Sequence, residues 1–318
     1  MSNQKKSVSL MSKIFILALV AVFVVLLVMF IAGGRYITDE SGIKFVGFVQ
    51  KTVDGNVPKS GTLYYDDGMT AKVTESGLTV TFKDGTVIEN AVKVEFANGS
   101  VYEGRMQGLQ MSGKGRYTWG AGEDGNSVYE GDFVNDAFTG TGSQYYSDGA
   151  IYIGSFADGK KQGTGVFIWN DCDTENLAQY SYATLSAACE QLTTESVKSL
   201  PMGTWYVGNF KEGKKEGYGT YHYDSNDVYC GLFSDDLKNG KGKFFYSNGD
   251  IYDGDYVADE RSGKGIYLWS DGKKYEGDFS KNAMNGTGVY TWPDGKTVTG
   301  TFKDNTFIGE GAEENEAE

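Results

Sequence analysis

YEGDFSKNAMNGTGVYTWPDGKT, residues 275–297, is the clearest copy of a unit that returns every 23 residues in this chain. Its first half alternates Tyr275, Gly277 and Phe279 with polar residues, and its second half alternates Gly288 and Tyr290 in the same way. Because side chains of a strand point alternately to its two faces, this pattern predicts two antiparallel strands joined by a turn. Recurrence at a period of roughly 20–50 residues indicates a repeat architecture.

Further copies open with the same tyrosine, glycine and aromatic residue, and one longer step of 54 residues separates Tyr152 from Tyr206. A looser copy begins at Tyr102, and a fading one begins at Val298. Large rings and small glycines share one face, so we predict that each ring packs over glycine on a neighbouring strand. The predicted repeat-core residues are Tyr129, Gly131, Phe133, Tyr152, Gly154, Phe156, Tyr206, Gly208, Phe210, Tyr229, Gly231, Phe233, Tyr252, Gly254, Tyr256, Tyr275, Gly277 and Phe279.

The unit resembles the MORN repeat (membrane occupation and recognition nexus), whose pattern is similar to Tyr-x-Gly-x-Trp/Phe followed by Gly-x-Gly and an aromatic-x-Asp/Asn-Gly ending. The resemblance covers roughly residues 100–305. It implies an all-β fold, an elongated antiparallel sheet of stacked β-hairpins. It also implies scaffolding, membrane tethering, or contact with proteins or lipids.

An uncharged run of 19 residues, IFILALVAVFVVLLVMFIA, occupies residues 14–32. As a helix it would be about 28 Å long, close to the thickness of a bilayer core, so we predict a transmembrane helix. Three lysines precede the run, against Arg35 and Lys44 after it, which favours a cytoplasmic segment 1–13 and extracytoplasmic repeats. A signal peptide cleaved near residues 32–34 is the alternative.

The remaining chain divides by its turn signatures and composition. Decayed aromatic-x-Asp/Asn-Gly endings predict irregular hairpins over residues 42–100. MORN repeats are predicted over residues 101–169 and 204–309, on either side of an insert at residues 170–203. The tail at residues 310–318 is acidic and without large apolar side chains, so we predict that it is disordered.

The insert contains apolar residues at helical spacing, which predicts one short helix over residues 174–192. The face away from the tyrosines is apolar mainly beside this insert, where Val207 and Cys230 replace charged residues. Apolar patches on a charged face indicate that something docks there. We therefore expect the helix to cover this face, with its side chains at Leu185, Ala188 and Leu192 facing the sheet. A disulfide between Cys189 and Cys230 is compatible with this docking and is not required by it.

Composition argues against several functions. The net charge of −14 opposes nucleic-acid binding, and a single histidine, His222, leaves no histidine-based triad or metal site. Gly-Lys-Gly triplets around Lys241 and Lys264 lack the spacing of a phosphate loop. Carboxylates of the polar face, such as Glu130, are predicted to be solvated. We therefore predict no catalytic, cofactor-binding or metal site, and no enzymatic activity.

The sequence favours a non-enzymatic, membrane-tethered MORN-repeat scaffold or surface-interaction protein with an unidentified protein partner. The alternative is an extracellular ligand-binding module for a cell-envelope glycan or a lipid headgroup. That alternative calls for an exposed aromatic row on the face opposite the tyrosines, where the positions are mainly charged or threonine. The sequence leaves the oligomeric state open.

Overall fold

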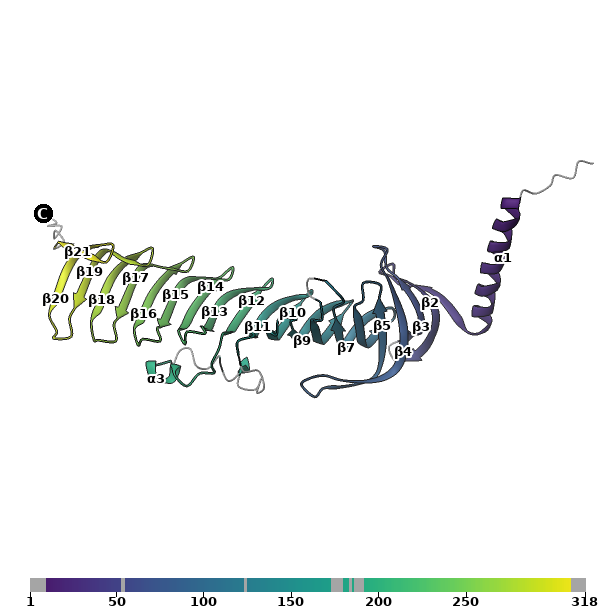
Figure 1. Cartoon of the computed structure of the whole chain (residues 1–318), viewed down its shortest axis with the longest axis horizontal. Coiled ribbons are helices and arrows are strands. Elements are labelled where there is room, and N and C mark those ends of the chain that lie inside the picture. Colours follow the sequence, from purple (N-terminus) through teal and green to yellow (C-terminus); the bar gives the residue numbers. More distant parts are fainter. Residues whose placement is uncertain are drawn as a thin grey trace, which may run out of the picture. The chain divides into compact units, whose positions relative to one another are not determined.

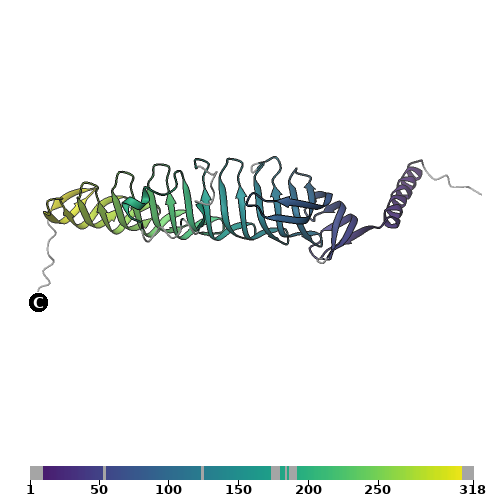
Figure 2. The same cartoon turned by 90° about the horizontal axis from the view of Figure 1, so that it is seen from below.

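The computed structural model describes residues 10–52, 55–122, 125–172, 180–182, 185 and 192–309. The chain divides into two compact units, Met1–Asp136 and Ala137–Glu318. In each unit every strand pairs antiparallel with the strand that follows it in sequence, as Figures 1 and 2 show. The predicted all-β, antiparallel arrangement of stacked hairpins is therefore confirmed.

The strands carry the labels of Figure 1. In the first unit they are β1 (Gly34–Thr38), β2 (Lys44–Thr52), β3 (Gly55–Tyr64), β4 (Thr70–Thr81), β5 (Val87–Phe96), β6 (Val101–Gln107), β7 (Gln110–Thr118) and β8 (Val128–Val134). In the second unit they are β9 (Ala137–Tyr145), β10 (Ile151–Ala157), β11 (Lys160–Ile168), β12 (Trp205–Lys211), β13 (Lys214–His222), β14 (Val228–Ser234), β15 (Leu237–Phe245), β16 (Ile251–Val257), β17 (Glu260–Leu268), β18 (Lys274–Ser280), β19 (Ala283–Thr291), β20 (Thr297–Lys303) and β21 (Thr306–Gly309).

The amino-terminal apolar run forms helix α1, Leu10–Ile31, of 22 residues. The helix begins four residues before the predicted residue 14 and ends one residue before residue 32. Among the residues that the structure describes, none of the helices is both long enough and apolar enough to pass through a membrane. The predicted transmembrane role of this segment is not shown and stays a prediction.

In the hairpins from β10–β11 to β20–β21, the two strands meet in a two-residue turn with positive φ at both residues. At the β14–β15 turn these are Asp235, φ 50°, and Asp236, φ 72°, which is the geometry of a type I′ turn. The carboxylate of Asp236 also accepts a hydrogen bond of 2.8 Å from the backbone N–H of Lys215 in the preceding hairpin. Asp259, Asn282 and Asn305 repeat this contact one hairpin further each time. These turns therefore connect each hairpin to the one before it.

The repeat core is a tyrosine ring lying over two glycines. A methyl group added at Gly288 would lie 2.4 Å from the hydroxyl of Tyr275, and one at Gly277 would lie 2.6 Å from the same oxygen. The hydroxyl of Tyr275 donates a hydrogen bond of 3.0 Å to the carbonyl of Asp278. The ring thus occupies the space that both glycines leave, one on its own strand and one on the neighbouring strand. The predicted packing of rings over glycine is confirmed.

The insert packs on the face opposite the tyrosines at the residues that the structure describes. Leu185 lies in a buried cluster with Val166 and Val207. Leu192 lies in a second cluster, with Cys230 and Phe245. The predicted docking is confirmed for these two leucines. Tyr180, also within the predicted helix, lies in the first cluster. Ala188 lies outside the described residues, and a four-residue helix, α3 (Thr194–Val197), follows the predicted one.

The cysteines differ in their chemical state. Cys230 is disulfide-bonded, whereas Cys172 has a free thiol whose Sγ donates a hydrogen bond of 3.0 Å to the carbonyl of Thr204. Burial raises the pKa of the Cys172 thiol to about 11. Cys189, the partner considered for Cys230 from the sequence, lies outside the described residues.

Candidate functional site

The predicted repeat-core residues lie on the first strand of each repeat, namely β8, β10, β12, β14, β16 and β18. All their aromatic rings are buried. Phe279 meets Tyr275 of its own strand at 5.2 Å between ring centroids and Tyr252 of the preceding hairpin at 5.0 Å, both edge to face. The rings of β10 to β18 in the second unit therefore form a buried ladder, the inner ladder, and little of it is available to a ligand.

A second row of rings lies beside the inner ladder on the same face and is only half-buried. Neighbouring rings of this outer ladder are 4.4 to 5.8 Å apart between centroids. Trp292, at its end, is 40% exposed. The outer ladder consists of Tyr146, Phe167, Trp169, Tyr221, Tyr223, Phe244, Tyr246, Tyr267, Trp269, Tyr290 and Trp292.

The position of the outer ladder corrects one expectation from the sequence. The exposed aromatic row that a ligand-binding module calls for was sought on the face opposite the tyrosines. The row lies instead on the tyrosine face, because Tyr290 pairs with Tyr275 and Trp292 follows two residues later on the same side. Sequence reasoning assigned these rings to the core, since alternation alone does not distinguish the covered middle of a strand from its open end.

Four cations, the cation row, lie between the two ladders: Lys161, Lys215, Lys238 and Arg261. Each is the second residue of a return strand, and its charged group lies against the ring six residues further along that strand. The ammonium of Lys161 is 4.7 Å from the centroid of Phe167, and that of Lys215 is 4.9 Å from the centroid of Tyr221. Lys238 and Arg261 repeat the contact, at 5.5 Å and 5.3 Å. Such distances are those of cation–π interactions.

The electrostatic setting of the cation row is unusual for an acidic chain. Burial lowers the pKa of Lys161, Lys215 and Lys238, because the charged form is partly removed from water. Lys238 lies 3.7 Å from the carboxylate of Asp259. Lys161 and Lys215 form no ion pair with any residue that the structure describes. The cation row was not predicted from the sequence, although its members share one spacing, five residues after the second aromatic residue of the motif.

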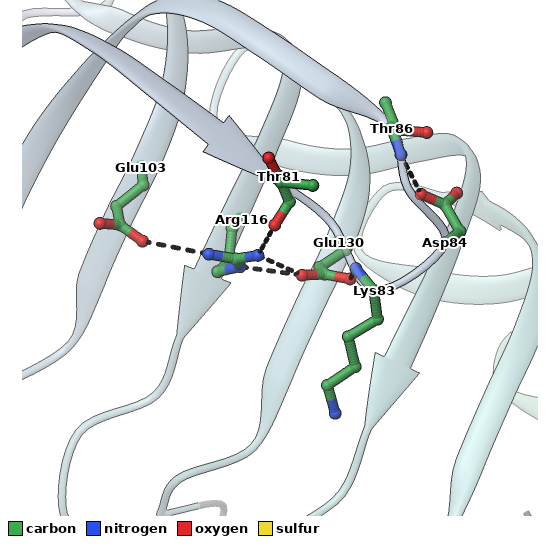
Figure 3. A network of polar contacts seen from close by, with 7 residues as sticks. All are labelled: Thr81, Lys83, Asp84, Thr86, Glu103, Arg116 and Glu130. Carbon is green, nitrogen blue, oxygen red and sulfur yellow. Dashed lines mark hydrogen bonds and ion pairs between the residues drawn. The ribbon is translucent and has the colours of Figure 1, made fainter. Parts of the chain in front are cut away.

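The face opposite the tyrosines is covered in the first unit by the hairpin of β4 and β5. Figure 3 shows how its turn is held by Arg116 and Glu130. Glu130 is only 4% exposed, and its carboxylate accepts hydrogen bonds of 2.8 Å from Arg116 and from the backbone N–H of Lys83. Arg116 also donates to the carbonyl of Thr81. The prediction that Glu130 is solvated was wrong, because the hairpin that buries it comes from a distant part of the sequence.

Other polar residues singled out in the sequence have structural roles. Lys241 and Lys264 form cross-strand ion pairs of 2.8 Å and 2.7 Å with Asp255 and Asp278. His222 is 1% exposed, and its Nδ1 lies 2.7 Å from the carbonyl oxygen of Gly203. Burial lowers the pKa of His222. These residues form no candidate catalytic group.

A β-hairpin array with tyrosines packed over paired glycines defines a class of repeat protein, and comparison gives its family. A model of the MORN repeat matches residues 102–123, 129–151, 152–171, 206–228, 229–251, 252–274 and 275–297. The chain belongs to the MORN repeat proteins. No curated protein matches it.

Solved structures with similarity to the chain include three domains of CPAP proteins. The TCP10 domain of CPAP from Danio rerio is 10% identical, with 84% of this chain and 100% of that chain covered and a TM-score of 0.29. The TCP domain of SAS-4 from Drosophila melanogaster, solved with a proline-rich motif of Ana2, is 11% identical over 85% and 90%, with a TM-score of 0.19. The G-box domain of CPAP is 12% identical over 85% and 100%, with a TM-score of 0.20.

Proposed function

We propose that this protein is a non-enzymatic, membrane-tethered interaction scaffold whose repeats lie on the extracytoplasmic side. MORN repeats support a scaffold or interaction module. The tether would be helix α1, which carries the apolar run. The disulfide at Cys230 supports the extracytoplasmic side, since disulfides persist mainly in oxidising compartments.

The interaction role rests on a difference in coverage between the two faces of the sheet. In the second unit, Leu185 and Leu192 close apolar clusters on the face opposite the tyrosines. On the tyrosine face, the outer ladder is left half-buried over its whole length. A contiguous exposed patch of aromatic side chains usually marks an interaction site, whereas single exposed apolar residues do not. We therefore propose the outer ladder as the surface that meets an unidentified protein partner.

Site-specific photo-crosslinking in native membranes tests this role. A photoreactive amino acid in place of Trp292 should give a discrete crosslinked protein, because that position lies on the outer ladder. The same group in place of Lys264, on the opposite face, is the matched control and should give none. Crosslinks from position 264 alone, or identical products from both positions, would contradict the proposed surface.

The tether and its orientation need a separate test. The full chain should stay with membranes during alkaline carbonate extraction, and a variant lacking residues 10–31 should be released. Protease added outside intact cells should digest the repeats, since the proposed orientation exposes them. Release of the full chain by carbonate would overturn the tether, and protection from external protease would overturn the orientation.

The outer ladder also favours the second candidate function, an extracellular ligand-binding module. Half-exposed tyrosine and tryptophan rings can stack on a ligand, and the cation row lies beside them. A glycan is favoured over a lipid headgroup, because successive sugar rings can stack on the successive rings of the outer ladder.

A further inference from the structure

The cation row is not needed to cover the inner ladder. In the register of the hairpins, Lys161 stands opposite Phe156, and Lys215 stands opposite Phe210. The same position is held by Met284 in the β18–β19 hairpin, opposite Phe279. Methionine fills irregular apolar space well, whereas a partly buried ammonium loses hydration. Packing therefore explains the methionine but not four consecutive cations.

Among the described residues, only Lys238 of the row pairs with a carboxylate, that of Asp259, in a chain that has many acidic residues. The sequence contains 43 acidic and 29 basic residues, yet Lys161 and Lys215 pair with none of the described ones. Asp236 acts electrostatically on both lysines, but its carboxylate is held by the backbone N–H of Lys215 at 2.8 Å. Arg261 likewise donates to a carbonyl, that of Asn282, rather than to a carboxylate. Such charges fit an anionic group supplied from outside the chain.

The spacing of the row constrains that partner. Its members are the second residues of β11, β13, β15 and β17, so successive cations are two strands apart, about 9.6 Å. The repeating disaccharide of an extended β-linked polysaccharide has nearly this length. The phosphates of one nucleic-acid strand lie closer together, about 3.4 Å per residue along the axis. An extended peptide repeats at about 6.8 Å for every two residues. Neither of these two spacings matches the row.

We propose that the tyrosine face of the second unit binds a linear acidic polysaccharide with one acidic group per disaccharide. Its sugar rings would lie on the outer ladder, and its acidic groups would meet Lys161, Lys215, Lys238 and Arg261 in turn. The inference deepens the second candidate function and rests on the proposed extracytoplasmic location. A polyproline-type peptide, which advances about 9.3 Å per turn, is the nearest rival. A polysaccharide fits better because its covalent repeat places one acidic group on every disaccharide.

The test measures binding of hyaluronate oligosaccharides, which have one carboxylate per disaccharide, to the full chain in phosphatidylcholine nanodiscs. Affinity should rise with oligosaccharide length until the ligand spans the row. The triple variant Lys161→Met, Lys215→Met and Lys238→Met should bind about tenfold or more weakly, because it removes three complementary charges. It should still fold, since Met284 already occupies the equivalent position.

Two controls make the result specific. The variant Lys241→Met, Lys264→Met and Lys274→Met removes the same number of charges from the opposite face and should bind like the parent. Trp292→Leu removes an exposed ring and should weaken binding without changing the melting temperature. Equal losses in the two triple variants would overturn the site, because they would show nonspecific attraction.

The remaining outcomes distinguish the polysaccharide from other ligands and the binding site from the proposed location. Equal binding of the methyl-esterified, uncharged oligosaccharide would overturn the role of the cations. Tighter binding of a Glu-Pro-Pro repeat peptide would replace the polysaccharide with a peptide. If hyaluronate fails while crosslinking at position 292 captures a protein, the polysaccharide proposal falls and the scaffold role stands. If hyaluronate binds while the repeats are protected from external protease, the proposed location falls and the site stands.

Discussion

The carboxylate of Glu130 on β8 accepts a hydrogen bond of 2.8 Å from the backbone N–H of Lys83, which lies 47 residues earlier. Arg116 holds the same carboxylate at 2.8 Å and approaches Glu103 at 3.6 Å. The turn between β4 and β5 is thereby fixed on the face opposite the tyrosines by charge-assisted hydrogen bonds, which are stronger than neutral ones.

Glu130→Gln should loosen this turn without unfolding the first unit. Glutamine keeps an acceptor but loses the charge that binds Arg116, so the free energy of opening should fall by about 1–3 kcal/mol. Amide hydrogen exchange at Lys83 measures the opening directly and should become faster. Glu95→Gln breaks an exposed ion pair with Lys93 and is the control, with exchange at Lys83 unchanged. Unchanged exchange in Glu130→Gln would mean that packing alone holds the turn.

Tyr256 stands where the neighbouring repeats have phenylalanine, and its hydroxyl is buried with no hydrogen-bond partner among the described residues. Tyr256→Phe should therefore stabilise the fold by about 1 kcal/mol, since an unsatisfied buried hydroxyl is removed. Tyr252→Phe removes the hydrogen bond of 3.0 Å to the carbonyl of Asp255 and should destabilise by a similar amount. Chemical denaturation of both variants measures the two changes in the free energy of unfolding, which should have opposite signs. Destabilisation by both changes would reveal a water bound to Tyr256.

The sequence predicted the parts of this protein that follow from local alternation. Tyrosine and glycine share a face because side chains alternate along a strand, and apolar Val207 and Cys230 on the other face marked where Leu185 and Leu192 dock. Glu130 escaped prediction because the hairpin that buries it is far away in sequence. Lys161 escaped it because a lysine beside a turn usually points into water, and its contact with Phe167 depends on the strand pairing around it.

Alkaline pH should destabilise the repeats through their buried tyrosines. Burial raises the pKa of Tyr275 and of Tyr221 from the ordinary value of 10.0 to about 12. The folded state keeps a proton that the unfolded chain loses above pH 10, so stability present below pH 10 falls as pH rises toward 12. Denaturation midpoints across this range measure the fall, which should be shallower for Tyr275→Phe. An equal slope in that variant would show that Tyr275 does not ionise differently on unfolding.

A larger side chain at a core glycine should destabilise the fold, whereas one on the opposite face should not. A Cβ at Gly265 would lie 2.5 Å from the hydroxyl of Tyr252, well inside van der Waals contact. Gly265→Val should therefore displace that ring and destabilise the second unit by about 1–3 kcal/mol, as overpacked cores do. Lys264→Val, one residue earlier, alters an exposed side chain of the opposite face and should change the free energy of unfolding by less than about 0.5 kcal/mol. Thermal and urea unfolding of the two variants make the comparison. Equal stabilities would mean that the ring moves aside without loss, so that the glycine pairs do not fix the repeat core.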